Sequence, residues 1–285
     1  MKKETTKYIN CALDIEAIKK YVSFLREIKA PYTLTMSSYT TTIKSDFINI
    51  RFMKEEKKMN FFARSKELKK EVADFLVVNQ IDKIASVEYY DIKEQENFIL
   101  PVIYNIDLSS AYLYVLKNNN IISNTLFEKL FKMQKQDRLA IVGMLASKKQ
   151  VFTFDESGEI SNYETIEEPE QRNIFFFCVY TVYFIMQEIK KMLGENYIFT
   201  WVDGIYYKDN KHTAAISDFL NAIEYPFKIE ELTNFEFYKN DKNIIEIDFL
   251  KNNKKKVFNI PLEKNNTFAN ELYNFINDQH KKITI

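Results

Sequence analysis

The segment Tyr197–Lys208, which reads YIFTWVDGIYYK, constrains the fold of this chain more than any other segment. Two runs of aromatic and β-branched residues flank one Asp-Gly step, and this pattern is the strongest short-range signal for a β-hairpin. We expect Gly204 to supply the positive φ that the tight turn needs. The hairpin would then hold Asp203 rigidly at its tip. Asp203 is either a surface turn residue or part of a site, and a second strand-borne acid elsewhere would favour the site.

The segment Phe98–Leu116, which reads FILPVIYNIDLSSAYLYVL, supplies such an acid. Its apolar run predicts a strand that delivers Asp107 at its end. Because burying an unpaired carboxylate is costly, Asp107 is expected either to face solvent or to be neutralised by a metal or an arginine. Asp107 and Asp203 together would suit two-metal phosphoryl transfer, in which one ion activates the attacking hydroxyl and the other stabilises the leaving pyrophosphate. Two aspartates can suffice, because Mg²⁺ accepts few carboxylates together with substrate phosphates.

Composition limits the class of protein. The chain has 285 residues, of which 46% are hydrophobic, enough for one to three packed units. Two cysteines give neither a disulfide framework nor a zinc motif, so a reducing compartment is expected. The N-terminus has no signal-peptide pattern, and the longest apolar run, residues 174–186, is too short to cross a bilayer. These features predict a soluble, cytoplasmic protein without a membrane partner.

The N-terminal third is the least readable part of the chain. Helical spacing over residues 13–30 and β-prone runs after Pro31 predict an α/β domain over residues 1–96. Residues 1–70 carry twice as many basic as acidic residues although the net charge of the chain is zero. A polyanion partner, such as nucleic acid, and solvated helix faces explain this equally well. Leu13-Asp14-Ile15-Glu16 resembles the first motif of proofreading exonucleases. The same residues also fit the helical spacing of this segment, which favours an exposed helix face.

Residues 125–149 have a helical pattern that carries regularly spaced cations. Lys132, Lys135 and Arg138 recur every three residues, so all three would lie near one face of the helix. Such a face suits a triphosphate, which needs positive charge at several oxygens, although an ordinary solvated face has the same pattern. A second helix, over residues 169–193, is nearly all apolar in its first half and is expected to pack beneath a sheet.

The segment NIDLSSAYLYVL resembles motif A of family B DNA polymerases, in which Asp, two spacers, Ser, a spacer and Tyr lead into a helix. By that resemblance Asp107 is a metal ligand, with the backbone carbonyl of Leu108 beside it. Ser110 and Tyr112 would bind the substrate, and Tyr112 would stack under the incoming sugar and exclude a 2′-hydroxyl. This chain has Leu113 where the family usually has proline, which affects a turn and not a ligand.

The cationic segment is similar in position to the fingers helix of the same family. Arg138 matches the cation that begins motif B, and the resemblance implies that Lys132 and Lys135 also bind the triphosphate. Leu145-Ala146 stands where the family has Tyr-Gly, so this motif is degenerate. Only about 30 residues separate motifs A and B, so the fingers would be very short.

The hairpin segment is similar to motif C of the family, which is typically Asp-Thr-Asp-Ser between two apolar strands. Asp203 matches the second aspartate, and Trp201 replaces the first. Further on, the basic-aromatic run with Lys254, Lys255 and Lys256 resembles the end-of-palm hairpin that touches the primer backbone, and a plain charged turn is the alternative.

Two weaker expectations concern the C-terminal part. Glu246 and Asp248 alternate on one strand face, where they would supply a third carboxylate or simply line a solvated edge. The spacing of Phe268, Leu272 and Phe275 predicts a short helix that would form a minimal thumb.

The resemblance as a whole implies an α+β fold. A polymerase-type palm, an antiparallel sheet backed by helices, would occupy residues 97–116 and 150–250. Very short helical fingers would occupy 117–149, the end-of-palm hairpin and minimal thumb 251–285, and the α/β N-terminal domain 1–96. Neither an exonuclease domain nor a priming mode is recognisable.

The implied function is that of a small, phage-type or protein-primed-like DNA polymerase that replicates a phage or a mobile element. It would use two Mg²⁺ ions, or Mn²⁺, with dNTPs, a DNA template and a primer, and would meet other replication proteins in the host cytoplasm. Trp201 and the degenerate motif B favour an alternative, an inactive palm protein that binds nucleic acid as a replication initiator or accessory factor. An unrelated α/β protein is the third interpretation.

Overall fold

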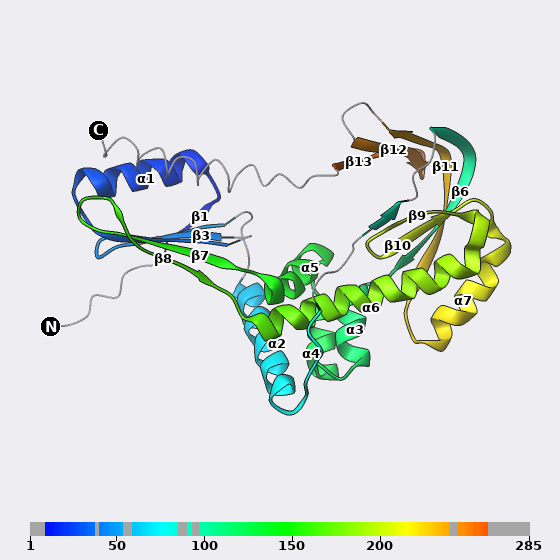
Figure 1. Cartoon of the computed structure of the whole chain (residues 1–285), viewed down its shortest axis with the longest axis horizontal. Coiled ribbons are helices and arrows are strands. Elements are labelled where there is room, and N and C mark those ends of the chain that lie inside the picture. Colours follow the sequence, from blue (N-terminus) through cyan, green and yellow to red (C-terminus); the bar gives the residue numbers. More distant parts are fainter. Residues whose placement is uncertain are drawn as a thin grey trace. The chain divides into compact units, whose positions relative to one another are not determined.

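The computed structural model describes residues 9–37, 40–53, 59–84, 90–92, 97–239 and 244–261. In these residues the chain is α+β, as expected, with two β-sheets (Figure 1). The helices are α1 (Ile15–Glu27), α2 (Met59–Val78), α3 (Ala111–Asn118), α4 (Asn124–Phe131), α5 (Lys135–Gly143), α6 (Pro169–Leu193) and α7 (Thr213–Ala222). The strands are β1 (Ile9–Ala12), β2 (Tyr32–Met36), β3 (Thr40–Lys44), β4 (Asn49–Met53), β5 (Tyr90–Ile92), β6 (Phe98–Leu108), β7 (Lys149–Phe154), β8 (Ile160–Ile166), β9 (Tyr197–Trp201), β10 (Gly204–Tyr207), β11 (Phe227–Lys239), β12 (Ile244–Lys251) and β13 (Lys254–Pro261).

The chain forms two compact units, each built from separate stretches of sequence. Among the described residues, the first unit contains those up to residue 66 together with 143–172, and the second contains 67–142 and 173–261. The first unit has a six-stranded sheet in the order β1-β4-β3-β2-β7-β8. All its neighbouring strands are antiparallel except β1 and β4.

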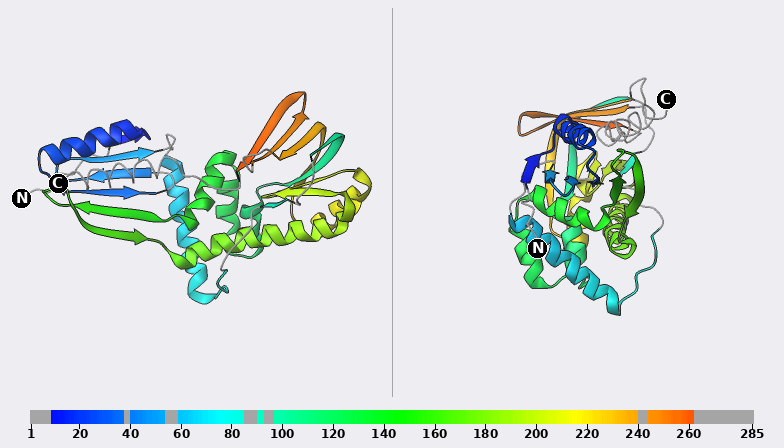
Figure 2. Two further views of the ribbon diagram at one scale, coloured as in Figure 1. Left: turned by 45° about the horizontal axis from the view of Figure 1, so that its top comes forward. Right: turned by 90° about the vertical axis from the view of Figure 1, so that its left-hand side faces the viewer.

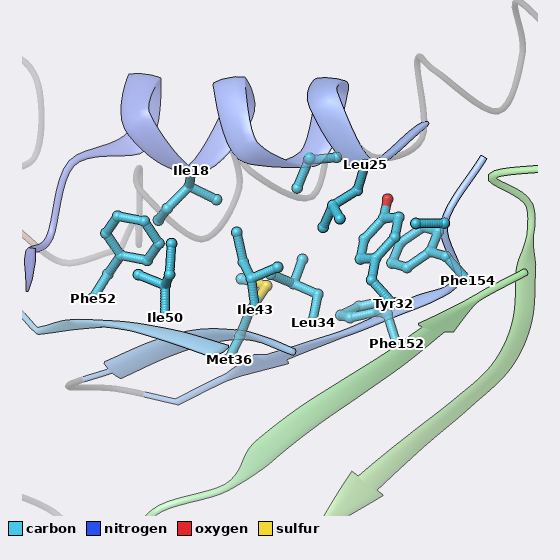
Figure 3. Close-up of a cluster of buried hydrophobic side chains, with 12 residues drawn as sticks. Ile18, Leu25, Tyr32, Leu34, Met36, Ile43, Ile50, Phe52, Phe152 and Phe154 are labelled. Carbon is cyan, nitrogen blue, oxygen red and sulfur yellow. The ribbon is translucent and has the colours of Figure 1, made fainter. Parts of the chain in front are cut away.

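Helix α1 covers one face of the first sheet. Its apolar stripe, Ile18, Val22 and Leu25, is fully buried against alternate residues of the strands (Figure 3). Asp14 begins the helix, because its carboxylate accepts hydrogen bonds from the backbone N–H groups of Glu16 and Ala17. Glu16 pairs with Lys19 on the same helix. These contacts agree with the helix and the exposed helix face that the periodicity predicts.

The β7–β8 hairpin lies in a different sheet from the one expected. The sequence assigned residues 150–250 to the palm, whereas β7 pairs with β2 and thereby joins the sheet of the first unit. The reason is packing: Phe152 and Phe154 are buried in the α1 core, and the Phe154 ring stacks on Tyr32 at 4.4 Å. Strands β7 and β8 therefore belong to the first unit and not to the sheet of the second.

The second unit has a seven-stranded antiparallel sheet in the order β13-β12-β11-β6-β10-β9-β5. Helix α6 runs along one face of this sheet (Figures 1 and 2), where the Lys190 ammonium pairs with Asp91 of β5. Tyr207 of β10 hydrogen-bonds Thr213 at the start of α7. Of the helices described, none is both long enough and apolar enough to cross a membrane.

The helix expected over residues 125–149 is broken. Helix α4 ends at Phe131, and α5 begins at Lys135. Arg138 donates hydrogen bonds from Nη1 to the carbonyl oxygens of Phe131 (2.7 Å) and Met133 (3.2 Å), which satisfies backbone groups that the break leaves without helical partners. Strand β7 already begins at Lys149. The cations therefore do not share one continuous helix.

Candidate functional site

Strand pairing brings Asp107 and Asp203 together. Asp107 is the penultimate residue of β6, and Asp203 lies in the two-residue connection between β9 and β10. β10 pairs with β6 in a register that sets Gly204 directly opposite Asp107. The backbone N–H of Leu108 donates a hydrogen bond to the Asp203 carbonyl at 2.8 Å. The expected hairpin is thus present, and the central strand of the sheet carries the partner acid beside its tip.

The turn that holds Asp203 differs from the predicted one. Its two connecting residues are Val202 and Asp203, and Val202, not Gly204, has the positive φ, at 55°. A left-handed conformation is strained for a β-branched residue. Gly204 instead begins β10 and allows a close approach: a Cβ there would lie 3.3 Å from Asn105 Nδ2 and 3.6 Å from Asp107 Oδ1. The absence of a side chain therefore leaves space beside the Asp107 carboxylate.

A second strained residue follows Asp107 by three positions. Ser110 has φ 56° and ψ 40°, and its side chain makes no capping bond to α3. Ser109 between them donates its backbone N–H to the carbonyl of Pro226, which fixes the path of the chain after β6. Non-glycine residues with left-handed backbones gather at functional sites more often than elsewhere. Ser110, three residues after Asp107, and Val202, directly before Asp203, are two such residues.

Burial raises the pKa of both aspartates, and electrostatic repulsion adds to this effect at Asp203. Burial, with the negative charge of Asp107, raises the pKa of Asp203 to about 6. Burial also raises the pKa of Asp107, against the opposing effect of Lys135. Among the described residues, no side chain forms an ion pair with either aspartate within 4 Å. A bound cation would relieve this repulsion.

The donor set suits a hard divalent cation of the Mg²⁺ type, which prefers oxygen ligands and retains several waters. Besides the two carboxylates, Leu108 offers a carbonyl. A residue in an antiparallel ladder directs its N–H and C=O to the same side, and the Leu108 N–H is directed to the Asp203 carbonyl. Within the described ranges, no group of three or more His, Cys, Asp or Glu side chains is arranged to hold a metal. Any metal at this site would depend on two carboxylates completed by water and substrate.

A shallow pocket that is open to solvent adjoins Asp203. Its lining residues come from the start of α3, from α5 and from the hairpin tip: Ser110, Tyr112, Leu113, Lys135, Arg138, Leu139, Val142 and Asp203. The α5 residues have the spacing i, i+3, i+4 and i+7, which is one helix face. The pocket thus combines one carboxylate, two cations, a phenol and apolar walls.

The three predicted cations have different positions. Lys135 lines the pocket and acts electrostatically on both Asp107 and Asp203. Arg138 also lines the pocket, but its Nη1 holds the end of α4, and its guanidinium lies 5.4 Å from the centre of the Phe131 ring. Lys132 is exposed at the end of α4 and does not line the pocket, because the helix break separates it from α5. The predicted spacing therefore identified two pocket residues of three.

Tyr112 lies in the pocket wall and makes an edge-to-face contact with Phe175 of α6, with ring centres 5.8 Å apart. This contact orients the ring from behind. Its expected role against a sugar stays a prediction.

The basic segment forms the tip of the β12–β13 hairpin. Asn252 and Asn253, both with positive φ, make the turn. Lys254 and Lys256 lie opposite Lys251 and Phe249, whereas Lys255 lies on the other face and pairs with Asp248 at 2.8 Å.

Because Asp248 forms an ion pair with Lys255, it does not supply a third carboxylate beside Asp107. The short helix expected from the spacing of Phe268, Leu272 and Phe275 lies outside the described residues, so the minimal thumb stays a prediction.

Sequence reasoning missed the polar residues of β11 and β12 beside Asp107. Lys228 lies directly opposite Asp107 in the β6–β11 ladder, and Glu230 lies opposite Asn105. Lys251 pairs with Glu230 at 2.5 Å. The polar residues of KIEE near the start of β11 could have indicated a charged strand face, but this pattern does not give the register of β11 with β6.

A comparison with models of protein families gave no match, and a comparison with curated proteins gave none either. The resemblance of motifs A, B and C to family B polymerases therefore stays a hypothesis based on a few residues.

Proposed function

We propose that the second unit is the palm of a small template-directed DNA polymerase of family B type. The observation that supports this proposal is the convergence of Asp107 and Asp203, from two different parts of the sequence, beside a pocket with Lys135, Arg138 and Tyr112. Motif-level resemblance and spatial convergence are independent, because the residues could match a motif and still lie far apart.

In the proposed reaction the primer 3′ oxygen forms a bond to the α-phosphorus of a dNTP. The bond from that phosphorus to the bridging oxygen breaks, pyrophosphate leaves, and the hydroxyl proton passes to solvent. Two divalent cations, Mg²⁺ or Mn²⁺, would supply Lewis acidity to the attacking and leaving oxygens when bound. Asp107 and Asp203 would hold them, with the Leu108 carbonyl as a further ligand.

The pocket residues would bind and orient the nucleotide. Lys135 would neutralise phosphate charge between the carboxylates and α5, and the free part of the Arg138 guanidinium would bind an outer phosphate. Tyr112 and Ser110 would contact the sugar. Lys254 and Lys256 would contact backbone phosphates of the nucleic acid, which fix its position without reading sequence.

The test is primer extension with Mg²⁺ or Mn²⁺. We expect Asp203→Ala to reduce incorporation by at least about a hundredfold, as loss of a metal ligand removes several kcal/mol of transition-state stabilisation. Asp218→Ala is the matched control, because Asp218 is exposed on α7 of the same unit. Incorporation that survives in Asp203→Ala would contradict the assignment.

Trp201 supports a second candidate, a palm that binds nucleic acid without polymerising. It lies opposite Gly204 at the hairpin, where the family has a carboxylate, and packs against the apolar cluster of the sheet. For this candidate we expect no incorporation by the wild type together with DNA binding that Asp203→Ala leaves unchanged.

A further inference from the structure

An ion pair lies on the sheet beside Asp107. Lys251 of β12 and Glu230 of β11 approach to 2.5 Å, and their side chains are 37% and 28% exposed. Glu230 is opposite Asn105, which precedes Asp107 by two residues on the same strand. Since opposed residues of an antiparallel ladder point to the same face, and since that face repeats every second residue, Glu230 and Asp107 project from the same face.

Both members of this pair influence Asp107. Glu230 is the diagonal neighbour of Asp107 across the β6–β11 ladder, because Lys228 lies opposite Asp107 and Glu230 lies two residues further on. Lys251 is bonded to Glu230, so both charges lie close to the Asp107 carboxylate. A lysine has a long flexible stem and a compact charge, and it can change partners at small cost. An ammonium paired with Asp107 would compete with a divalent cation for the same oxygens.

We propose that Glu230 is a positioning residue that keeps the Lys251 ammonium away from Asp107, so that Asp107 stays free to bind a divalent cation. This inference rests on the proposed metal site. It adds a residue outside motifs A, B and C, and it assigns to Glu230 an effect on metal affinity that is exerted only through Lys251.

A purely structural role predicts a different outcome. A half-exposed ion pair adds little to fold stability, so removal of Glu230 alone should leave the protein folded. In the proposed role the loss of Glu230 harms metal binding only while Lys251 is present. Removal of both side chains should then restore binding, which a structural role does not predict.

Metal binding can be measured without catalysis, because Trp201 is the single tryptophan of the chain and lies opposite Gly204 at the site. The experiment is a titration of Trp201 fluorescence with paramagnetic Mn²⁺, which quenches nearby indole. The proteins are the wild type, Glu230→Gln, Lys251→Met and the double variant. Glu231→Gln is the matched control, because Glu231 is the exposed neighbour of Glu230 and lies opposite Tyr104. Thermal melting checks that each variant is folded.

We expect Glu230→Gln to weaken Mn²⁺ binding about threefold to tenfold, within the range of a partly screened charge contact. The double variant and Glu231→Gln should bind within about twofold of the wild type, and Lys251→Met equally or more tightly. Equal affinity of Glu230→Gln and Glu231→Gln would overturn the inference, as would a double variant that stays weak or a Lys251→Met that binds less tightly.

The same titration separates this inference from the proposed function. If Mn²⁺ quenches the wild type and Asp203→Ala abolishes this quenching, the metal site is present, whatever the result for the Glu230 variants. If Mn²⁺ does not quench the wild type, or if Asp203→Ala is quenched to the same extent as the wild type, the metal site is overturned, and this inference is overturned with it.

Discussion

At the scale of single residues, the site combines backbone strain with unfavourable charge. Val202 and Ser110 have left-handed backbones, which cost of order 1–3 kcal/mol each. Asp107 and Asp203 are two half-buried acids, and the negative charge of Asp107 raises the pKa of Asp203. Structural packing alone would favour replacing all four residues. Their presence at one place is therefore typical of a site that is stabilised when a ligand binds.

The raised pKa of Asp203 predicts a pH-dependent stability. Its folded pKa of about 6 exceeds the ordinary value of 3.8, so between these values the folded protein binds more protons than the unfolded chain. Stability without metal should therefore fall as pH rises from about 4 to 6. Asp203→Asn removes the charge and should raise the free energy of unfolding by about 1–3 kcal/mol near pH 7.5, but not near pH 4.

Urea denaturation in EDTA at the two pH values measures this difference. Asp218→Asn is the control and should change the free energy of unfolding by less than about 0.5 kcal/mol at either pH. An equal effect of Asp203→Asn at both pH values would show that charge is not the cause.

At the scale of elements, the break between α4 and α5 gives the two pocket cations different roles. Arg138 caps the end of α4 and lines the pocket, whereas Lys135 lines the pocket and acts electrostatically on the two aspartates. Sequence periodicity predicted one helix, because the spacing of the apolar residues continues across the break. The hydrogen bonds from Arg138 to the two carbonyl groups exist only in the folded chain, so the sequence pattern could not predict them.

Substitution should separate these roles. Arg138→Met should lower the free energy of unfolding by about 1–2 kcal/mol, because charged hydrogen bonds to two carbonyls are lost. Lys135→Met should change it by less than about 0.5 kcal/mol, while weakening dNTP binding by about tenfold. Chemical denaturation and nucleotide titration give the two values. A large loss of stability in Lys135→Met would contradict this division.

The β12–β13 hairpin makes a second prediction at this scale. Lys254 and Lys256 face the side of Lys251, whereas Lys255 faces the other side and pairs with Asp248. For the double variant of Lys254 and Lys256 to Ala, we expect weaker DNA binding and a salt-dependence slope reduced by about 0.7–0.9 for each lysine. Lys255→Ala should leave the slope unchanged. Equal slopes for the two variants would contradict the assignment.

At the scale of the whole molecule, the first unit depends on a distant hairpin. Strand β7 supplies two aromatic core residues, Phe152 and Phe154, and covers the edge of β2. The N-terminal domain predicted at residues 1–96 therefore lacks two strands of its own sheet.

A fragment of residues 1–96 should consequently fail to fold, because it exposes the edge of β2 and loses core aromatics. The same fragment joined to residues 147–168 by a Gly/Ser linker should fold better. Thermal melts followed by circular dichroism compare the two. A cooperative melt of residues 1–96 alone would show that β7 and β8 are dispensable.

The sequence alone determined the elements whose signals are local. The hairpin that carries Asp203, the strand that carries Asp107 near its end, helix α1 and the α+β class all follow from apolar periodicity and turn chemistry over a few residues. Five predicted site residues line one pocket, because α5 repeats with helical spacing and Asp203 occupies a tight turn. The family and the function implied by these residues stay predictions.

Only the tertiary structure decided the features that depend on pairing between distant segments. The sheet that β7 joins, the break after α4, the strain at Val202 and the approach of Glu230 and Lys251 to Asp107 are of this kind. The physical reason is register: which residue of β11 lies opposite Asp107 is fixed by the packing of the whole sheet. No local pattern along the chain contains that information.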